Sequence, residues 1–370
     1  MEQNNKTKEE QQNEGNNGHG QTPLDELLKK AGERGNGVVV RPNANKHITV
    51  QFNPSPLLVK KEEGTYQEKL ETEKDWYTKG QQLLKDAEYE DAIEAFSRAI
   101  ELNPEYVKAY NSRGVAYDEI GDYQQAIENY DKAIELNPEY ATAYNNRGMV
   151  YDGLGDSQRA ICDYDKAIEL KPESVVVYNN RGVAYRNLGD YQRAIENYDK
   201  ALELNPQYTA AYFNRGLAHG NFGNHQEAIK DFGRAIELNP RFALAYYDRG
   251  VTYAQLGDYQ QAICDYGKTI ELDPEYAAVY CNIGAAYAQL GNYHQAIKYY
   301  DKSIALNPES AKDYNNRGHA YAEIGNDKKA IEDYKVAAIL GHKKAQDFLR
   351  KEGIDWQGEL GLGGEVLNGK

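Results

Sequence analysis

The pattern of apolar, small and turn-forming residues repeats along this chain with a fixed period of 34 residues. Glycine recurs eight times in one frame, from Gly80 to Gly318, and alanine recurs eight times in another, from Ala92 to Ala330. Proline keeps a third frame, at Pro104, Pro138, Pro172, Pro206, Pro240, Pro274 and Pro308. Eight units therefore run from Glu73 to Lys344, and most of the chain is predicted to be one repeat array rather than several unrelated domains.

Each unit is predicted to form two helices, as the unit Val107–Tyr140 illustrates. The first helix is expected at about Val107–Ile120 and the second at about Gln124–Asn137. Gly121–Tyr123 separates them, because glycine and aspartate favour turns. Proline at the end of the unit lacks a backbone donor and restricts the residue before it, which ends the second helix.

The helix pairs are predicted to pack very closely. With the first residue of a unit as position 1, glycine at position 8 is present in all eight units, although a glycine inside a helix costs about 1 kcal/mol relative to alanine. Its retention indicates that the two helices approach too closely there for a side chain. Alanine at position 20 and a small residue at position 27 are expected to form the facing surface.

These positions together resemble the tetratricopeptide repeat, in a prokaryotic-type array. The marks are an aromatic residue at position 4, Gly at 8, Tyr at 11, Ala at 20, an aromatic residue at 24, a small residue at 27 and Pro at 32. The resemblance implies an all-α fold, an α-solenoid in which antiparallel helix pairs form a right-handed superhelix with the first helix of each pair lining a concave groove. It also implies a non-catalytic scaffold that binds a protein or peptide.

The regions that flank the repeats have a different composition. Residues 1–70 are expected to be largely disordered, with a short helix at 23–31 or a hairpin from strand-like runs between 38 and 52. Segment 38–59 either stays free or docks on the superhelix, where its own groove is one place for it. The array occupies 71–352 with a capping helix at its end, and 353–370 is expected to be a flexible tail. His342 replaces the last proline, so the final second helix is expected to run on there.

Asparagine recurs at position 6, on the expected concave surface, at Asn146, Asn180, Asn214, Asn282 and Asn316. This series looks like the asparagine ladder in the superhelical repeats of the O-linked N-acetylglucosamine transferases. An amide offers both a donor and an acceptor, so a ladder of amides can pair with the backbone of an extended peptide. The alternative is that each asparagine is simply a solvated or locally bonded helix residue. Apolar side chains are expected in the middle of the groove, at Phe213, Leu217, Tyr247 and Val251.

A second pattern links positions 7 and 23 within each unit. Position 7 is arginine in six units, and position 23 is Asn or Asp in those same six. Where position 7 is Lys79 or Ile283, position 23 is Ala95 or Tyr299. We predict a contact between arginine and Asn or Asp across the two helices of one repeat. The alternative is common descent of the repeats, which copies such pairs without any contact.

Charge and composition exclude several classes of function. With 43 Lys+Arg and 58 Asp+Glu the net charge is −15, which argues against binding to nucleic acid or to an anionic membrane surface. Three cysteines without CxxC spacing, no apolar run of membrane-spanning length and no apolar leader favour a cytoplasmic protein. No motif for a nucleophile, metal or phosphate site occurs, so neither catalysis nor a cofactor is expected. The 32 tyrosines are largely explained by the repeat, because five positions account for 28 of them.

Two functions follow from these observations. The first is a scaffold that binds one extended segment of a partner along the concave groove, as a monomer. The alternative is a self-assembling structural protein or assembly factor that interacts through the ends of the solenoid or its convex face.

Overall fold

The computed structural model describes residues 38–42, 48–52 and 72–356. The expected disorder of residues 1–20, the short helix at 23–31 and most of the C-terminal tail lie outside these ranges. The described elements are β1 (Val38–Pro42), β2 (Ile48–Phe52), α2 (Glu73–Lys85), α3 (Tyr89–Leu102), α4 (Val107–Glu119), α5 (Tyr123–Leu136), α6 (Ala141–Gly153), α7 (Ser157–Leu170), α8 (Val175–Asn187), α9 (Tyr191–Leu204), α10 (Thr209–Phe222), α11 (His225–Leu238), α12 (Ala243–Gln255), α13 (Tyr259–Leu272), α14 (Ala277–Gln289), α15 (Tyr293–Leu306), α16 (Ala311–Glu323), α17 (Asp327–Ile339) and α18 (Lys343–Lys351).

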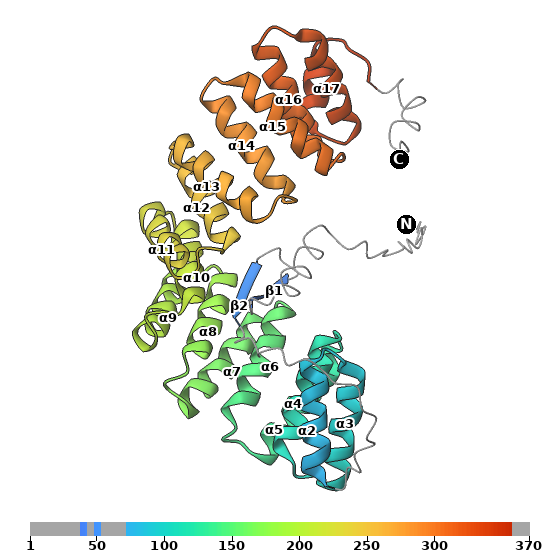
Figure 1. Ribbon diagram of the computed structural model, residues 1–370, viewed down its shortest axis with the longest axis vertical. Helices are drawn as coiled ribbons and strands as arrows, with labels where there is room; N and C mark the ends of the chain where they lie inside the picture. The colour runs from blue at the N-terminus through green and yellow to red at the C-terminus, as the bar shows by residue number, and fades with distance from the viewer. Residues whose placement is uncertain (1–37, 43–47, 53–71, 357–370) are drawn as a thin grey trace, which may run out of the picture.

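Eight helix pairs follow one another, and the predicted all-α solenoid is confirmed (Figure 1). The turn inside the second pair shows how the sequence sets the boundaries. Gly121 takes a left-handed conformation with φ +82°, which ends α4. The Asp122 carboxylate then accepts a hydrogen bond of 3.1 Å from the backbone N–H of Gln125, which caps α5. At the other end, α5 stops at Leu136, just before the extended Asn137 and the proline.

The predicted close approach at position 8 is present, but its partner is an aromatic ring. A Cβ atom placed on Gly114 would lie 2.7 Å from Cε1 of Tyr130, the aromatic residue at position 24 of the same unit. The same contact recurs in every pair, with Phe96 or Phe232 in place of tyrosine in two of them. Ala126 and Ala133, at positions 20 and 27, are fully buried in the same core. The ring therefore fills the space that the glycine leaves, and the alanines line its surroundings.

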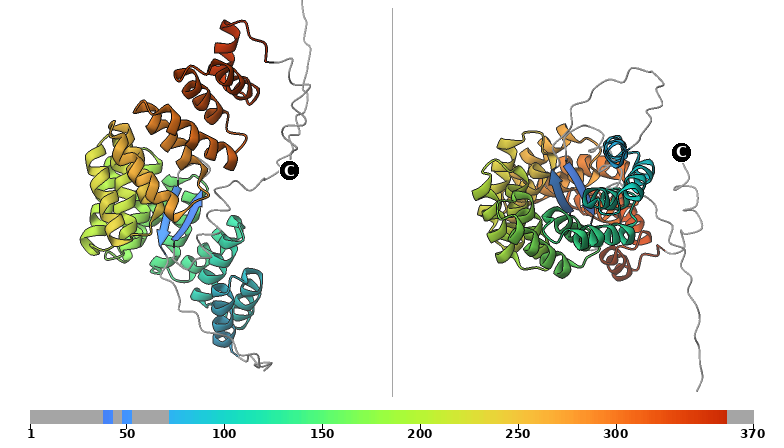
Figure 2. Two further views of the ribbon diagram at one scale, coloured as in Figure 1. Left: turned by 45° about the horizontal axis from the view of Figure 1, so that its top comes forward. Right: turned by 90° about the horizontal axis from the view of Figure 1, so that it is seen from below.

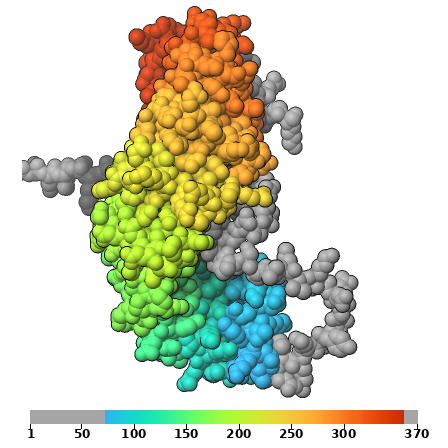
Figure 3. Space-filling model, turned by 60° about the vertical axis from the view of Figure 1, so that its left-hand side comes forward, coloured from blue at the N-terminus to red at the C-terminus, as the bar shows by residue number. Residues whose placement is uncertain are grey.

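The first helices of the pairs form the inner side of the solenoid. Each first helix from α2 to α16 packs on the next first helix, whereas the second helices meet mainly their direct neighbours in sequence. The stack curves, and the curve encloses β1 and β2 (Figure 2). On the outside the pairs form one continuous surface from α2 to the C-terminal helices (Figure 3).

The last pair is covered by a single helix, α18, as a solenoid end requires. Leu349 of α18 is fully buried, and Trp356 packs against the same cluster. Phe348 remains 40% exposed, with its ring 4.8 Å from that of Tyr334. The expectation that the preceding helix runs on through His342 is wrong: α17 ends at Ile339, and His342 caps α18 instead.

The strand-like runs near the N-terminus form an antiparallel pair. Val38 of β1 lies opposite Phe52 of β2, and Pro42 lies opposite Ile48. Strand β2 lies against α10, in the middle of the array. No helix in the described part of the chain is long and apolar enough to cross a membrane.

Candidate functional site

The asparagines at position 6 form a ladder of hydrogen bonds between repeats, which we call the amide ladder. Four of the five, Asn146, Asn180, Asn214 and Asn282, donate from Nδ2 to the side chain at position 5 of the preceding repeat. In three of these bonds the acceptor is the amide oxygen of another asparagine: Asn146 donates to Asn111 (3.1 Å), Asn180 to Asn145 (3.1 Å) and Asn214 to Asn179 (3.0 Å). In the fourth, Asn282 donates to the hydroxyl of Tyr247 (3.2 Å). In the second repeat Ser112 replaces asparagine and accepts from Gln81 at 2.8 Å.

This pairing changes what the ladder can offer to a ligand. Because the amide nitrogens are engaged between repeats, the free groups in its centre are mainly acceptors. Oδ1 of Asn180 and Oδ1 of Asn214 are buried and lack a hydrogen-bond partner among the described residues, as does Nδ2 of Asn179. The unpaired groups at its centre are thus two oxygens and one nitrogen.

Burial of the ladder differs along the array. Asn180 is 2% exposed and Asn214 is fully buried, whereas Asn146, Asn282 and Asn316 are only partly buried. The two deep residues lie on α8 and α10, at the centre of the solenoid. The other three lie on α6, α14 and α16, farther towards its ends.

The apolar residues predicted for the groove occupy two different environments. Phe213 is 1% exposed, and its ring packs 5.8 Å from that of Phe232 and 4.7 Å from that of Phe242. The expectation that Phe213 lies open in the groove is therefore wrong, because its side chain belongs to the core between α10, α11 and α12. Leu217, Tyr247 and Val251 are partly buried and flank the same cores.

Asp248 interrupts the amide ladder at the sixth repeat. It holds position 6, but a carboxylate has no N–H to donate, and Phe213 at position 5 of the preceding repeat has no acceptor. The side chain is partly buried, and burial raises the pKa of Asp248 to about 7, while the positive charge of Arg186 lowers it. The centre of the inner face therefore carries a carboxylate that is costly to ionise.

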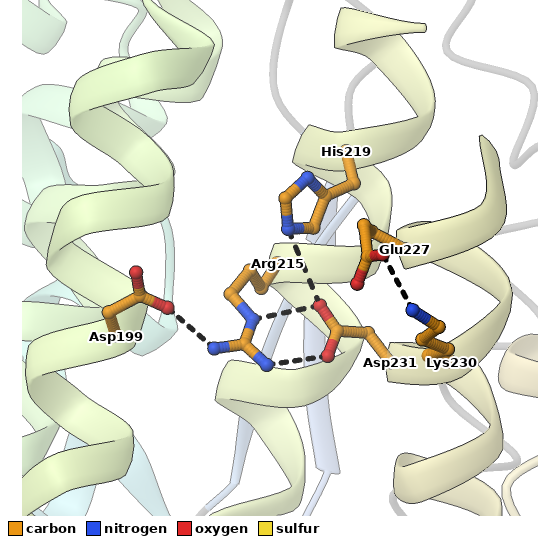
Figure 4. Close-up of polar contacts among 6 residues, drawn as sticks. All are labelled: Asp199, Arg215, His219, Glu227, Lys230 and Asp231. Atoms are coloured by element: carbon orange, nitrogen blue, oxygen red, sulfur yellow. Dashed lines mark hydrogen bonds and ion pairs between the residues drawn. The ribbon is translucent and has the colours of Figure 1, made fainter. Parts of the chain in front are cut away.

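The predicted arginine contacts are confirmed in all six repeats. Arg113, Arg147, Arg181, Arg215, Arg249 and Arg317 each donate from Nε to the residue at position 23 of the same repeat, at 2.7–2.8 Å. Where that residue is aspartate the contact is bidentate, as for Arg215 with Asp231 at 2.8 and 2.6 Å (Figure 4). A planar guanidinium suits such a fork.

Most of these arginines also reach back to the preceding repeat. Nη1 of Arg215 donates to the carboxylate of Asp199, at position 25 of the preceding repeat, at 2.5 Å (Figure 4). Within its own repeat, Nε2 of His219 lies 3.9 Å from the carboxylate of Asp231. Burial lowers the pKa of His219, against the pull of Asp231. We call an arginine at position 7 that binds position 25 of the preceding repeat an arginine bridge. The bridges join Arg113 to Ser97, Arg147 to Asp131, Arg181 to Asp165, Arg215 to Asp199 and Arg317 to Asp301.

Two features were missed in the sequence, although the signal was there. Positions 5 and 6 of adjacent units carry asparagines 35 residues apart, as Asn111 and Asn146 do, which predicts their pairing once the helices stack. Aspartate at position 25 precedes an arginine at position 7 by 16 residues, as Asp131 precedes Arg147. No group of three or more potential metal ligands occurs within the described ranges of the chain.

Comparisons with known proteins match the repeats directly. A family model described as Tetratricopeptide repeat matches residues 107–140, 175–208, 209–242 and 277–310. A model described as TPR repeat matches 80–121 and 252–291, and another Tetratricopeptide repeat model matches 129–161, 232–263 and 299–332. No curated protein matches the chain.

Solved structures resemble the chain over its repeats. A structure of MamA is 33% identical over 45% of this chain and 96% of MamA, with a TM-score of 0.42. A structure of YrrB, described as a TPR protein with an unusual peptide-binding site, is 30% identical over 50% of this chain and 96% of YrrB, with a TM-score of 0.42. A tetratricopeptide repeat protein from Parabacteroides merdae ATCC 43184 is 22% identical over 67% of this chain and 98% of that protein. Its TM-score is 0.52, so it shares the fold.

Proposed function

Because the chain belongs to the tetratricopeptide repeat family, we propose that it is a non-catalytic scaffold that binds an extended segment of a partner protein along its inner face. The binding region is the centre of the amide ladder, on α8 and α10. A cytoplasmic location and a monomeric state remain part of this proposal. The observation that carries it is the pair of buried oxygens, on Asn180 and Asn214, that have no hydrogen-bond donor in the part of the chain that the structure describes.

A ligand that pairs with these buried polar atoms would bind with a favourable free energy. Leaving such an atom unsatisfied costs about 1–3 kcal/mol, so a group that satisfies it gains a corresponding part of that free energy. The two oxygens require donors, and Nδ2 of Asn179 requires an acceptor. An extended polypeptide backbone supplies N–H and C=O groups whatever its side chains are. The ladder would thus provide affinity that is largely independent of sequence.

Side-chain selectivity would come from the residues beside the ladder. Leu217, Tyr247 and Val251 are partly buried and apolar, and they suit apolar side chains of the bound segment. Asp248 would favour a lysine or arginine on the segment, because a nearby positive charge stabilises its ionised form. A partner segment of mixed apolar and basic character therefore fits best.

The role of the backbone can be tested with a random 12-residue peptide library displayed on phage. Peptides selected on the full chain would be resynthesised with single N-methyl groups, which remove one backbone donor and leave the side chains unchanged. We expect N-methylation at one or two central positions to weaken binding about tenfold or more, as measured by titration calorimetry, because each buried oxygen then stays unpaired. Equal affinity for every N-methylated peptide would contradict the proposal.

A matched set of protein variants locates the site. Asn180→Ala/Asn214→Ala is expected to weaken the selected peptides, whereas Asn316→Ala, at the same position in the last repeat, is expected to leave them unchanged. Circular dichroism of each variant checks that the array still folds. Light scattering over a range of concentrations tests the competing function, because self-assembly requires a mass that grows with concentration.

A further inference from the structure

The chain carries a segment of its own at the proposed binding region. Strands β1 and β2 lie within the curve of the solenoid, with helices around them in both views of Figure 2. Strand β2 lies against α10, the helix that carries Asn214 and Leu217. A strand is an extended segment of the kind that the amide ladder is proposed to bind.

The burial pattern of the ladder agrees with this placement. Asn180 and Asn214 are nearly inaccessible, while Asn146 and Asn316, at the same position on α6 and α16, are partly exposed. One residue type at one position of the repeat thus has two levels of burial. The deep level occurs on α10, where β2 lies, and on the adjacent first helix α8.

Charge also favours this segment as the occupant. The stretch from residue 38 to residue 52 contains Arg41 and Lys46 and no acidic residue. Residues 1–70 contain ten basic and ten acidic residues, so the net charge of −15 belongs to residues 71–370. The positive charge of this stretch is complementary to the negative charge of residues 71–370.

We propose that the strand pair 38–52 is an intramolecular ligand of the inner face, which must leave before a partner segment can bind. This inference rests on the proposed function. Within the described ranges no donor reaches the oxygens of Asn180 and Asn214. A partner whose backbone reaches those oxygens would therefore replace the strand pair at a gain. The apparent affinity for a partner is then reduced by the fraction of molecules in which the strands occupy the site.

Photochemical crosslinking tests the contact without any partner. Leu217 would be replaced by p-benzoylphenylalanine in the full chain. This variant would then be irradiated at low protein concentration. We expect a monomeric product in which mass spectrometry finds position 217 joined to residues 38–52. The matched control is the same replacement at Val115, which holds position 9 in the second repeat as Leu217 does in the fifth. Absence of that product, equal crosslinking of 38–52 from both positions, or crosslinks only in dimers would overturn the inference.

Competition is tested with charge variants of the full chain. Arg41→Glu/Lys46→Glu is expected to raise the affinity for a library-selected peptide by about threefold or more, because the competent state is more populated. Lys6→Glu/Lys8→Glu makes the same change of charge outside the strands, and no such rise is expected. Equal effects of the two variants would overturn competition. If no library peptide binds but the 217 crosslink forms, the proposed function fails while the intramolecular contact stands.

Discussion

The joints between successive repeats differ between the N-terminal part of the array and its centre. Arginine bridges join the first five repeats to one another, and another joins the last two. The joint from α11 to α12 has Gly233 where the acceptor would be, so Arg249 binds only within its own repeat. The joint from α13 to α14 has Gly267 in place of the acceptor and Ile283 in place of the arginine, so it lacks both partners of a bridge.

Aromatic pairs lie at these two central joints, without the bridge that accompanies the aromatic pair Tyr77–Tyr106 at the first joint. The ring of Phe213 lies 4.7 Å from that of Phe242, and the ring of Tyr247 lies 5.0 Å from that of Tyr276. A charge-assisted hydrogen bond is directional, whereas apolar contacts are largely non-directional. The comparison teaches that the part of the superhelix most free to change its angle lies at these two joints, directly after the binding region on α8 and α10.

The largest expected effect comes from removing a bridging arginine. Arg147→Met leaves the carboxylate of Asp163, which is 8% exposed, without its cation. An uncompensated buried charge is strongly destabilising, so we expect a loss of about 3 kcal/mol. Because an array unfolds repeat by repeat, hydrogen exchange of α6 and α7 is the appropriate measurement.

A second substitution identifies the cause of that loss. Asp163→Asn on the Arg147→Met background removes the buried charge, and Asn129 and Asn197 hold the same position in other repeats. We expect it to recover at least about 1 kcal/mol. If the double variant is as unstable as Arg147→Met alone, the loss comes from packing of the arginine stem or from the lost bridge to Asp131, and not from the uncompensated charge of Asp163.

Contacts within one repeat could be predicted from the sequence, whereas contacts between repeats could not. The helix pairs, the glycine contact and the arginine pairs at positions 7 and 23 repeat eight or six times, and repetition made them recognisable. The bridge to position 25 and the pairing of the ladder cross from one repeat to the next, so they become visible only when stacking is known. Phe213 was misplaced because position 5 was expected on the concave surface and is asparagine in four other repeats, while here its ring reaches the core.

The carboxylate that interrupts the ladder gives the central joint a distinct pH dependence. The pKa of Asp248 is raised from 3.8 to about 7 in the folded chain, so between about pH 4 and 7 the folded state holds a proton that the unfolded state has lost. Stability of this joint should therefore fall as pH rises through that window. Asp248→Asn removes the effect, and we expect this variant to be more stable than the parent by at least about 1 kcal/mol at pH 8, with the difference vanishing near pH 4.

Thermal melts and exchange of α12, taken at both pH values, measure this effect. Asp152 provides the comparison, because its pKa is also raised by burial but Ser157 and Asn187 donate to its carboxylate. Asp152→Asn should therefore gain less stability at pH 8 than Asp248→Asn, because it also disturbs these hydrogen bonds. A stability gain for Asp248→Asn that is equal at pH 4 and pH 8 would show that packing and not ionisation is responsible.

The smallest expected effect tests the comparison most directly, by adding the missing bridge. A Cβ atom placed on Gly233 would lie 3.6 Å from Nη1 of Arg249, so Gly233→Asp brings a carboxylate within reach of an existing guanidinium. The matched control is Gly267→Asp, which makes the same change at the next joint, where Ile283 offers no cation. Both variants gain about 0.5 kcal/mol from replacing glycine in a helix, but only Gly233→Asp should gain about 0.5 kcal/mol more from the ion pair. That extra part should disappear in 1 M salt, because the pair is near the surface and screened.

Hydrogen exchange of α12 distinguishes the two outcomes. If it is slower in Gly233→Asp but not in Gly267→Asp, the bridges hold adjacent repeats together. If the two variants exchange at the same rate, aromatic packing already fixes the central joints as firmly as the bridges fix the others.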